Sequence, residues 1–341
     1  MPTYVLEGGG RAKLPAKPLT LRVQAPEGAP PKLAAFIGGQ PDHRAITPMP
    51  GMLVLPRVEQ ETVVRVLPSS GETFGSASVL ALSAAIEIHG DADPERAVMS
   101  SIDVSGLSGR DLVTVRPAGS EIEVEAMGLL ADAPLPELAG RARDAARELL
   151  GVERVFGDQS VGMDLVVDAS ASMRLHVLDG SAAAVIEVIV GVSRVISGDR
   201  EPKVTLSSAR ARQLPSIAPE ALPRAVHDAL AETRMTTGFR SSVDNPDADS
   251  ITCVVADAIP ADLPTERTHL VALLPDSTAQ VLAPRLPRSS TVVPVSEWGA
   301  ESAYGLLSED PQLLRRVVAS LLAGLLPGDS PLQQRLGVAG R

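Results

Sequence analysis

Short apolar stretches separated by Pro and Gly fill about the first 130 residues. Val63-Val-Arg-Val-Leu67 and Glu121-Ile-Glu-Val-Glu-Ala126 alternate in part between apolar and polar positions, as strands with one buried face do. Regularly punctuated short strands are typical of a β-sandwich. We expect strands at Leu19–Val23, Leu33–Ile37, Met52–Leu55, Thr62–Leu67, Val79–Ile88, Leu112–Val115 and Ile122–Ala126.

A different pattern begins after residue 134. Good helix formers run from Pro134 to a stop at Gly151, which predicts a helix that closes a β-rich first domain at 1–150. From Val161 onward, apolar strands alternate with amphipathic or apolar helices, and this predicts an α/β doubly wound, Rossmann-like domain over 160–330. We expect the residues beyond it, 331–341, to be a flexible tail.

The expected elements of the second domain follow directly from its pattern. Strands are predicted at 161–168, 251–257, 269–274 and 291–295, and a hairpin at 203–207 and 211–217. Helices are predicted at 180–196, 219–233 and 310–326.

Oxygen-bearing side chains gather where two of these strands end. Asp168-Ala-Ser170-Ala-Ser172 follows the first strand, and Asp257 ends a later one. Between them, Thr236 and Thr237 lie in a loop after a predicted helix. Ligand sites of α/β sheets lie outside the carboxyl ends of the strands. Two carboxylates with hydroxyls at one sheet edge offer hard oxygen ligands, which suit Mg²⁺ or Mn²⁺.

On these motifs, residues 160–327 resemble a von Willebrand factor A (VWA) domain with a metal-ion-dependent adhesion site. The family's metal-binding positions fall on Asp168, Ser170, Ser172, Thr236 (with Thr237 as the alternative) and Asp257. The resemblance implies Mg²⁺ held directly by the serines and threonine, with the aspartates acting partly through water. It also implies an open coordination position that an acidic side chain of a partner protein fills.

The sequence departs from the family at Ala171, Ala256 and Ala258, where the family commonly has Gly, Thr and Gly. The alternative interpretation is a VWA fold without a working metal site. In that case Ser170 and Ser172 would only cap the N-terminus of the following helix.

Within this family the chain is most similar to the TerF type from bacterial tellurium-resistance (Ter) gene clusters, through Leu165–Arg174 and Asp179-Gly180-Ser181. The N-terminal half resembles the TerD β-sandwich domain more weakly, through Glu121–Gly128. The acidic, Gly-Asp-rich calcium loops that are typical of TerD are not visible in this sequence. One segment, His89-Gly-Asp91-Ala-Asp93, resembles them weakly. The resemblance implies work in a bacterial stress or defence assembly that is membrane-associated through its partners.

Composition narrows the function classes further. A net charge of −11, from 31 basic and 42 acidic residues, argues against nucleic acid and anionic membranes as partners. Only seven of 341 residues are aromatic, so a base-stacking platform is not expected. The single cysteine, Cys253, excludes an intrachain disulfide. The five histidines are dispersed and form no zinc motif. The N-terminus lacks a signal-peptide pattern, and we expect a cytoplasmic protein.

These observations favour a non-enzymatic interaction module that binds partners through Mg²⁺. One alternative is a Mg²⁺-dependent phosphohydrolase that uses Asp168 and Asp257, although Arg174 is the one basic residue near either acid in the sequence. Another is a VWA partner subunit of an AAA-ATPase. The lone Trp298 is either an interface anchor or a packing residue of the last helix.

Overall fold

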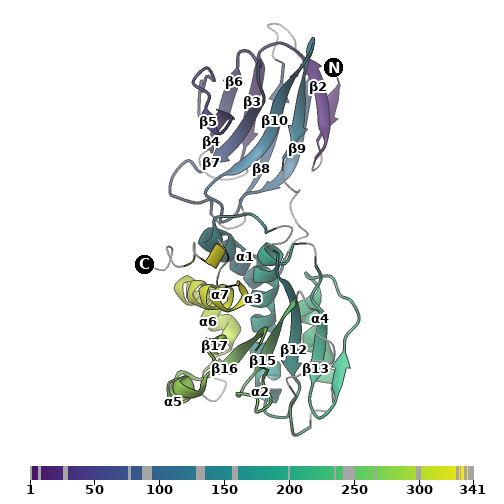
Figure 1. The fold of residues 1–341 in the computed structure, drawn as a ribbon, viewed down its shortest axis with the longest axis vertical. Coiled ribbons are helices and arrows are strands. Elements are labelled where there is room, and N and C mark those ends of the chain that lie inside the picture. The colour runs from purple at the N-terminus through teal and green to yellow at the C-terminus, as the bar shows by residue number, and fades with distance from the viewer. Residues whose placement is uncertain are drawn as a thin grey trace. The chain divides into compact units, whose positions relative to one another are not determined.

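The computed structural model (Figure 1) describes residues 2–6, 9–25, 30–75, 78–86, 94–127, 135–155, 160–198, 200–233, 236–240, 250–264, 266–296, 301–327, 330, 332–333 and 336. The chain divides into two compact units, Met1–Ala133 and Pro134–Arg341.

The first unit contains strands in two sheets. Its strands are β1 (Thr3–Val5), β2 (Arg11–Pro15), β3 (Leu19–Gln24), β4 (Lys32–Ile37), β5 (Gln40–Pro41), β6 (Met52–Leu55), β7 (Thr62–Leu67), β8 (Val79–Ala85), β9 (Arg96–Asp103), β10 (Arg110–Ala118) and β11 (Glu121–Ala126). One sheet has the order β1-β9-β8-β3-β6 and the other β2-β11-β10-β7-β4-β5. Neighbouring strands are antiparallel except β1 and β9, which are parallel.

Both sheets of this unit contribute to one hydrophobic core. Along β7, the side chains of Thr62, Val64 and Val66 are buried and those between them are half-buried, so the expected alternation is present. Leu19 and Leu21 of the other sheet belong to the same buried cluster. The two largely antiparallel sheets of this unit therefore share a common core. Each of the seven expected strands is present.

The second unit combines a largely parallel sheet with helices. Its strands are β12 (Gly162–Asp168), β13 (Val204–Ser207), β14 (Ala211–Gln213), β15 (Ser250–Ala256), β16 (Thr268–Leu274) and β17 (Ser290–Pro294). Its helices are α1 (Glu137–Leu150), α2 (Arg174–Leu178), α3 (Ser181–Ile196), α4 (Leu222–Glu232), α5 (Asp276–Leu282), the 3₁₀ turn η2 (Ala283–Arg285), α6 (Ala303–Glu309) and α7 (Pro311–Leu325).

The sheet has the order β14-β13-β12-β15-β16-β17, in which only β14 is antiparallel to its neighbour. In chain order this is 3-2-1-4-5-6, an order found in open α/β sheets. The predicted hairpin is confirmed, because β13 and β14 pair antiparallel.

Buried residues cover both faces of this sheet. On one face, side chains such as Leu165 and Val255 pack in the cluster that contains residues of α1, α3, α4, α6 and α7, and Figure 1 shows α1, α3 and α7 together beside the strands. On the other face, Val166 and Val254 pack with residues of α5 and of loops.

Helix α1 belongs to the second unit, so the division of the chain differs from the expected boundary at residue 150. The helix packs closely against α3: a Cβ atom added to Gly191 would lie 2.2 Å from the carbonyl oxygen of Ala139. Amphipathic spacing predicts the helix correctly, but it does not show which core the apolar face joins.

Of the expected tail 331–341, the structure describes three residues. Leu332 is buried in the core of the second unit, and Leu336 packs partly against it. Trp298 and the segment 89–93 lie outside the described residues. No helix among the described residues has the length and apolarity that crossing a membrane requires.

Candidate metal centre

The two predicted carboxylates lie at the ends of adjacent parallel strands. Asp168 is the last residue of β12, Asp257 directly follows β15, and the two strands pair in register. From β12 the chain continues to β13 on one side, and after β14 it returns to β15 on the other. This is the point where the strand order reverses, and open α/β sheets bind ligands there.

A continuous series of hydrogen bonds connects the two carboxylates. The Ser170 amide donates to Asp168 Oδ1 at 2.7 Å. The hydroxyls of Ser170 and Ser172 hydrogen-bond to each other at 2.9 Å. The Ser172 hydroxyl donates to Asp257 Oδ1 at 3.1 Å. The oxygen atoms of four predicted side chains are therefore gathered in one place.

Thr236 lies beside the same loop through its backbone. It forms an isolated parallel bridge with Ser170, and its carbonyl oxygen accepts a hydrogen bond from the Ala171 amide at 3.0 Å. Thr236 and Thr237 are both exposed. The structure thus brings all five predicted residues together, and Thr236 is the threonine whose backbone contacts the serine loop.

The serine hydroxyls do not cap a helix. The N-cap residue of α2 is Met173 and that of α3 is Gly180, and neither helix has a side-chain hydrogen bond at its cap. Ser170 and Ser172 instead hydrogen-bond to each other and to Asp257. This geometry argues against the alternative interpretation in which the serines serve only to begin the next helix.

Burial disfavours the charged form of Asp168. It raises the pKa of this carboxyl to about 6, and the nearby charge of Asp257 acts in the same direction, although hydrogen bonds from Ser170 oppose the shift. Among the described residues, neither Asp168 nor Asp257 forms an ion pair with a basic side chain. A bound cation would stabilise both carboxylates and relieve their repulsion.

The donors fit Mg²⁺ or Mn²⁺ better than a transition metal that prefers nitrogen or sulfur. Two carboxylates and serine hydroxyls are hard oxygen ligands. Within the described parts of the chain, no three His, Cys, Asp or Glu side chains cluster closely enough to hold a metal. A cation at this edge would therefore depend on the hydroxyls for part of its coordination, because Ala256 and Ala258 add no side-chain oxygen.

Other residues near this site could not be predicted from the motif. Ser207 ends β13, pairs in register with Asp168 and donates its hydroxyl hydrogen to the Arg240 carbonyl oxygen at 2.6 Å. The Ser208 amide donates to the Arg210 carbonyl oxygen at 3.2 Å. The backbones of Arg210 and Arg240 therefore also lie near the acids in space, although only Arg174 is near them in the sequence. The feature of the sequence that could have indicated these residues is the Ser207-Ser208 pair at the end of β13.

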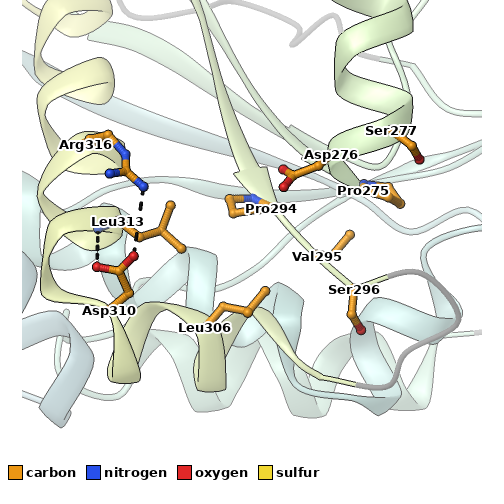
Figure 2. Close-up of a pocket in the computed structure, with 10 residues that line it drawn as sticks. All are labelled: Pro275, Asp276, Ser277, Pro294, Val295, Ser296, Leu306, Asp310, Leu313 and Arg316. Carbon is orange, nitrogen blue, oxygen red and sulfur yellow. Dashed lines mark hydrogen bonds and ion pairs between the residues drawn. The ribbon is translucent and has the colours of Figure 1, made fainter.

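A recess of about 550 Å³ lies further along the same edge of the sheet, at the ends of β16 and β17. Figure 2 shows Arg316 reaching toward Asp310, whereas Asp276 lies on the other side of Pro294. The Asp310 carboxylate accepts hydrogen bonds from the amides of Gln312 and Leu313, so it caps α7. Because Asp310 serves this cap and Asp276 lies apart from it (Figure 2), the recess is a weaker candidate for a ligand site.

The comparison with known proteins identified no relative of this chain. The chain matches no protein-family model, and no curated protein matches it significantly. The function must therefore follow from the geometry of the site and from the resemblance in its motifs.

Proposed function

We propose that residues 160–327 form a VWA-type domain that holds Mg²⁺ between the ends of β12 and β15. Through this ion it binds an acidic side chain of a partner protein, without catalysing a reaction. The observation that carries the proposal is the hydrogen-bonded series from Ser170 through Ser172 to Asp257. It gathers oxygen ligands at the reversal point of the sheet, where a ligand site is expected.

The roles of the residues follow the resemblance. Ser170, Ser172 and Thr236 would bind the ion through their hydroxyl oxygens, and Asp168 and Asp257 would act partly through water. One position would remain open for the partner's carboxylate. Mg²⁺ usually keeps several waters in protein sites, so a partner can replace one of them. Mn²⁺ has similar ligand preferences.

The surroundings of the carboxylates favour binding over phosphohydrolase chemistry. In the described structure, the side-chain and amide groups that hydrogen-bond to Asp168 and Asp257 belong to Ser170 and Ser172. No His or Lys hydrogen-bonds to either acid there. A hydrolase site needs a group that transfers a proton to or from the reacting water.

The biological setting is proposed from the sequence resemblance. A TerF-like protein would work in a bacterial Ter-type stress or defence assembly, membrane-associated through its partners, and its β-rich unit would be a second docking surface. An AAA-ATPase partner would use the same binding chemistry.

Thermal unfolding with and without Mg²⁺ tests the proposal. A ligand present at about a hundredfold excess over its Kd stabilises a protein by about 2.7 kcal/mol, and we expect a shift of this order for the wild type. Ser170→Ala and Asp257→Asn should remove the shift, because each deletes a ligand. No shift with either Mg²⁺ or Mn²⁺ would exclude the metal site.

Two control variants make the same chemical changes elsewhere in the unit. Ser290 begins β17, so Ser290→Ala removes a hydroxyl at the opposite edge of the sheet. Asp228→Asn removes an exposed carboxylate of α4. Both should keep the full response to Mg²⁺. Metal-dependent phosphatase turnover that requires Asp257 would contradict the non-enzymatic part of the proposal.

A further inference from the structure

Three exposed arginines come from separate segments close to the candidate metal centre, and we call them the basic rim: Arg174, Arg210 and Arg240. Arg174 begins α2, two residues after Ser172. The other two are held near β13 by backbone contacts to Ser207 and Ser208. Within the described structure, no ion pair or hydrogen bond occupies their guanidinium groups. The protein as a whole carries a net charge of −11, so the unpaired positive charge at this edge is opposite in sign to that of the whole chain.

Two exposed leucines accompany the basic rim, and we call them the leucine pair: Leu175 and Leu178. Their exposed fractions are 65% and 71%. Both lie on α2, three positions apart, which places them on one side of the helix. Val177 of the same helix is buried in the core, so α2 is anchored to the unit while the leucine pair faces solvent. Exposed apolar groups rimmed by polar residues are a feature of protein-interaction sites.

We propose that this edge docks an acidic, amphipathic segment of a partner protein. One carboxylate of the segment would bind the metal, further carboxylates would pair with the basic rim, and apolar side chains would cover the leucine pair. The inference rests on the proposed function, which supplies the metal, and it adds the character of the partner.

Charge complementarity selects this occupant over others. A net charge of −11 opposes approach to a phosphate-rich membrane or nucleic acid, whereas a short acidic segment meets only the local field of the basic rim and the metal. An anion without apolar groups would leave the leucine pair uncovered. A segment that carries both acidic and apolar side chains satisfies all three parts of the surface, and buried apolar anchors beside paired charges are typical of strong interfaces.

Selection from a display library of random short peptides tests the inference on the full chain. In Mg²⁺, the wild type should enrich peptides that combine Asp or Glu with Leu, Ile, Val or Phe, and EDTA should abolish this enrichment. For a peptide so selected, the variant L175S/L178S should bind about tenfold more weakly. R210Q should also weaken binding. Both variants should keep the thermal shift that Mg²⁺ produces, because neither changes a metal ligand.

Matched controls make the same substitutions outside the basic rim and the leucine pair. Val281 of α5 is 76% exposed, and Arg285 is an exposed residue of η2. V281S and R285Q should bind the selected peptides as the wild type does. Equal binding by L175S/L178S and the wild type would overturn the inference. So would Mg²⁺-dependent binding to phosphatidylserine vesicles that requires the leucine pair.

The two proposals fail in different ways. If Mg²⁺ does not stabilise the wild type, the metal site is wrong and this inference is overturned with it. If Mg²⁺ stabilises the protein but the selected peptides show no joint enrichment of acidic and apolar residues over the input library, only the character of the partner is wrong.

Discussion

One surface of the first unit uses its arginines differently from one surface of the second unit. On the six-stranded sheet of the first unit, Arg65 pairs with Asp111 at 2.6 Å and Arg116 pairs with Glu61 at 2.6 Å. Arg11 pairs with Glu125 at 2.9 Å. The Arg65 and Arg11 pairs each join two strands, and Glu61 directly precedes β7, so all three arginines are paired within the unit. At the carboxyl edge of the parallel sheet, the basic rim has no such partners in the described structure.

The difference separates a surface with paired charges from one on which we propose that a partner binds. Cross-strand pairs of opposite charge help to fix the register of a sheet, and they leave little net charge to attract a partner. The basic rim has no ion-pair partner among the described residues, so its positive charge is available to an acidic partner of the kind proposed above. This contrast supports the proposal that the second unit binds a partner.

The largest expected effect on stability concerns the packing of α1 against α3 inside the second unit. Gly191→Ala places a methyl group where a Cβ would lie 2.2 Å from the Ala139 carbonyl oxygen. Overpacking of this kind costs about 1–3 kcal/mol or more, and we expect the cost in the unfolding transition of the second unit alone. Differential scanning calorimetry measures this directly.

The matched control has the opposite sign. Gly140 lies in α1 with no atom within 4 Å of an added Cβ, so Gly140→Ala should stabilise the unit by up to about 1 kcal/mol through helix propensity. Equal stability of the two variants, or a Gly191→Ala effect confined to the first unit, would show that α1 does not pack on α3 as described.

A smaller effect tests the electrostatics of the metal centre. Without metal at neutral pH, Asp168→Asn should stabilise the second unit by roughly 1–2 kcal/mol, because it removes a buried charge whose pKa is raised to about 6. The native carboxyl binds a proton more readily than the unfolded one, so the benefit should shrink as the pH falls below about 6 and vanish near the unfolded pKa. Saturating Mg²⁺ should reverse the order of stability.

The pH profile of the wild type has a second, opposing contribution. His269 is buried between Ser289 and Thr291, and its two ring nitrogens hydrogen-bond to their hydroxyls at 3.0 and 2.9 Å. Burial lowers the pKa of this imidazole to about 4, so it destabilises the native state as the pH falls from about 6.5. Asp168→Asn should therefore lose stability more steeply with acidification than the wild type. Parallel pH profiles would contradict the burial of Asp168.

The smallest effect compares the two kinds of arginine directly. Arg116→Gln breaks two ion pairs on the six-stranded sheet, and exposed pairs contribute about 0–1 kcal/mol. Arg210→Gln should change stability by less than about 0.5 kcal/mol, since no partner is lost. Denaturant unfolding at low and high salt separates them: only the Arg116→Gln effect should shrink with added salt.

The sequence predicted most of the fold because its patterns are local. Alternation gave the central strands of the first unit, and apolar runs gave the strands of the parallel sheet. The strands β1, β2, β5 and β9 were not predicted. β2 carries polar residues such as Arg11 and Lys13, and β1, β2 and β9 depend on pairing with strands that are distant in the sequence. The domain to which α1 belongs was also unpredictable, because it depends on the contact that Gly191 permits.

In the candidate site, too, the residues of a local motif could be predicted, and those that depend on distant contacts could not. Asp168, Ser170 and Ser172 form a local motif, and Asp257 follows from the rule that sites lie at strand ends. The basic rim could not be predicted, because Arg210 and Arg240 reach β13 through turns and loops whose paths no periodicity encodes. The exposure of Leu175 and Leu178 was likewise hidden, since an apolar residue in a sequence is normally expected inside.

Isothermal titration calorimetry with Mg²⁺ tests the central claim most directly. We predict that the wild-type chain binds one Mg²⁺ ion, that Ser170→Ala abolishes the binding heat, and that Ser290→Ala leaves it unchanged. If the wild type shows no binding to Mg²⁺ or Mn²⁺, or if Ser170→Ala binds as the wild type does, the oxygen atoms at the ends of β12 and β15 do not form the metal site proposed for this protein.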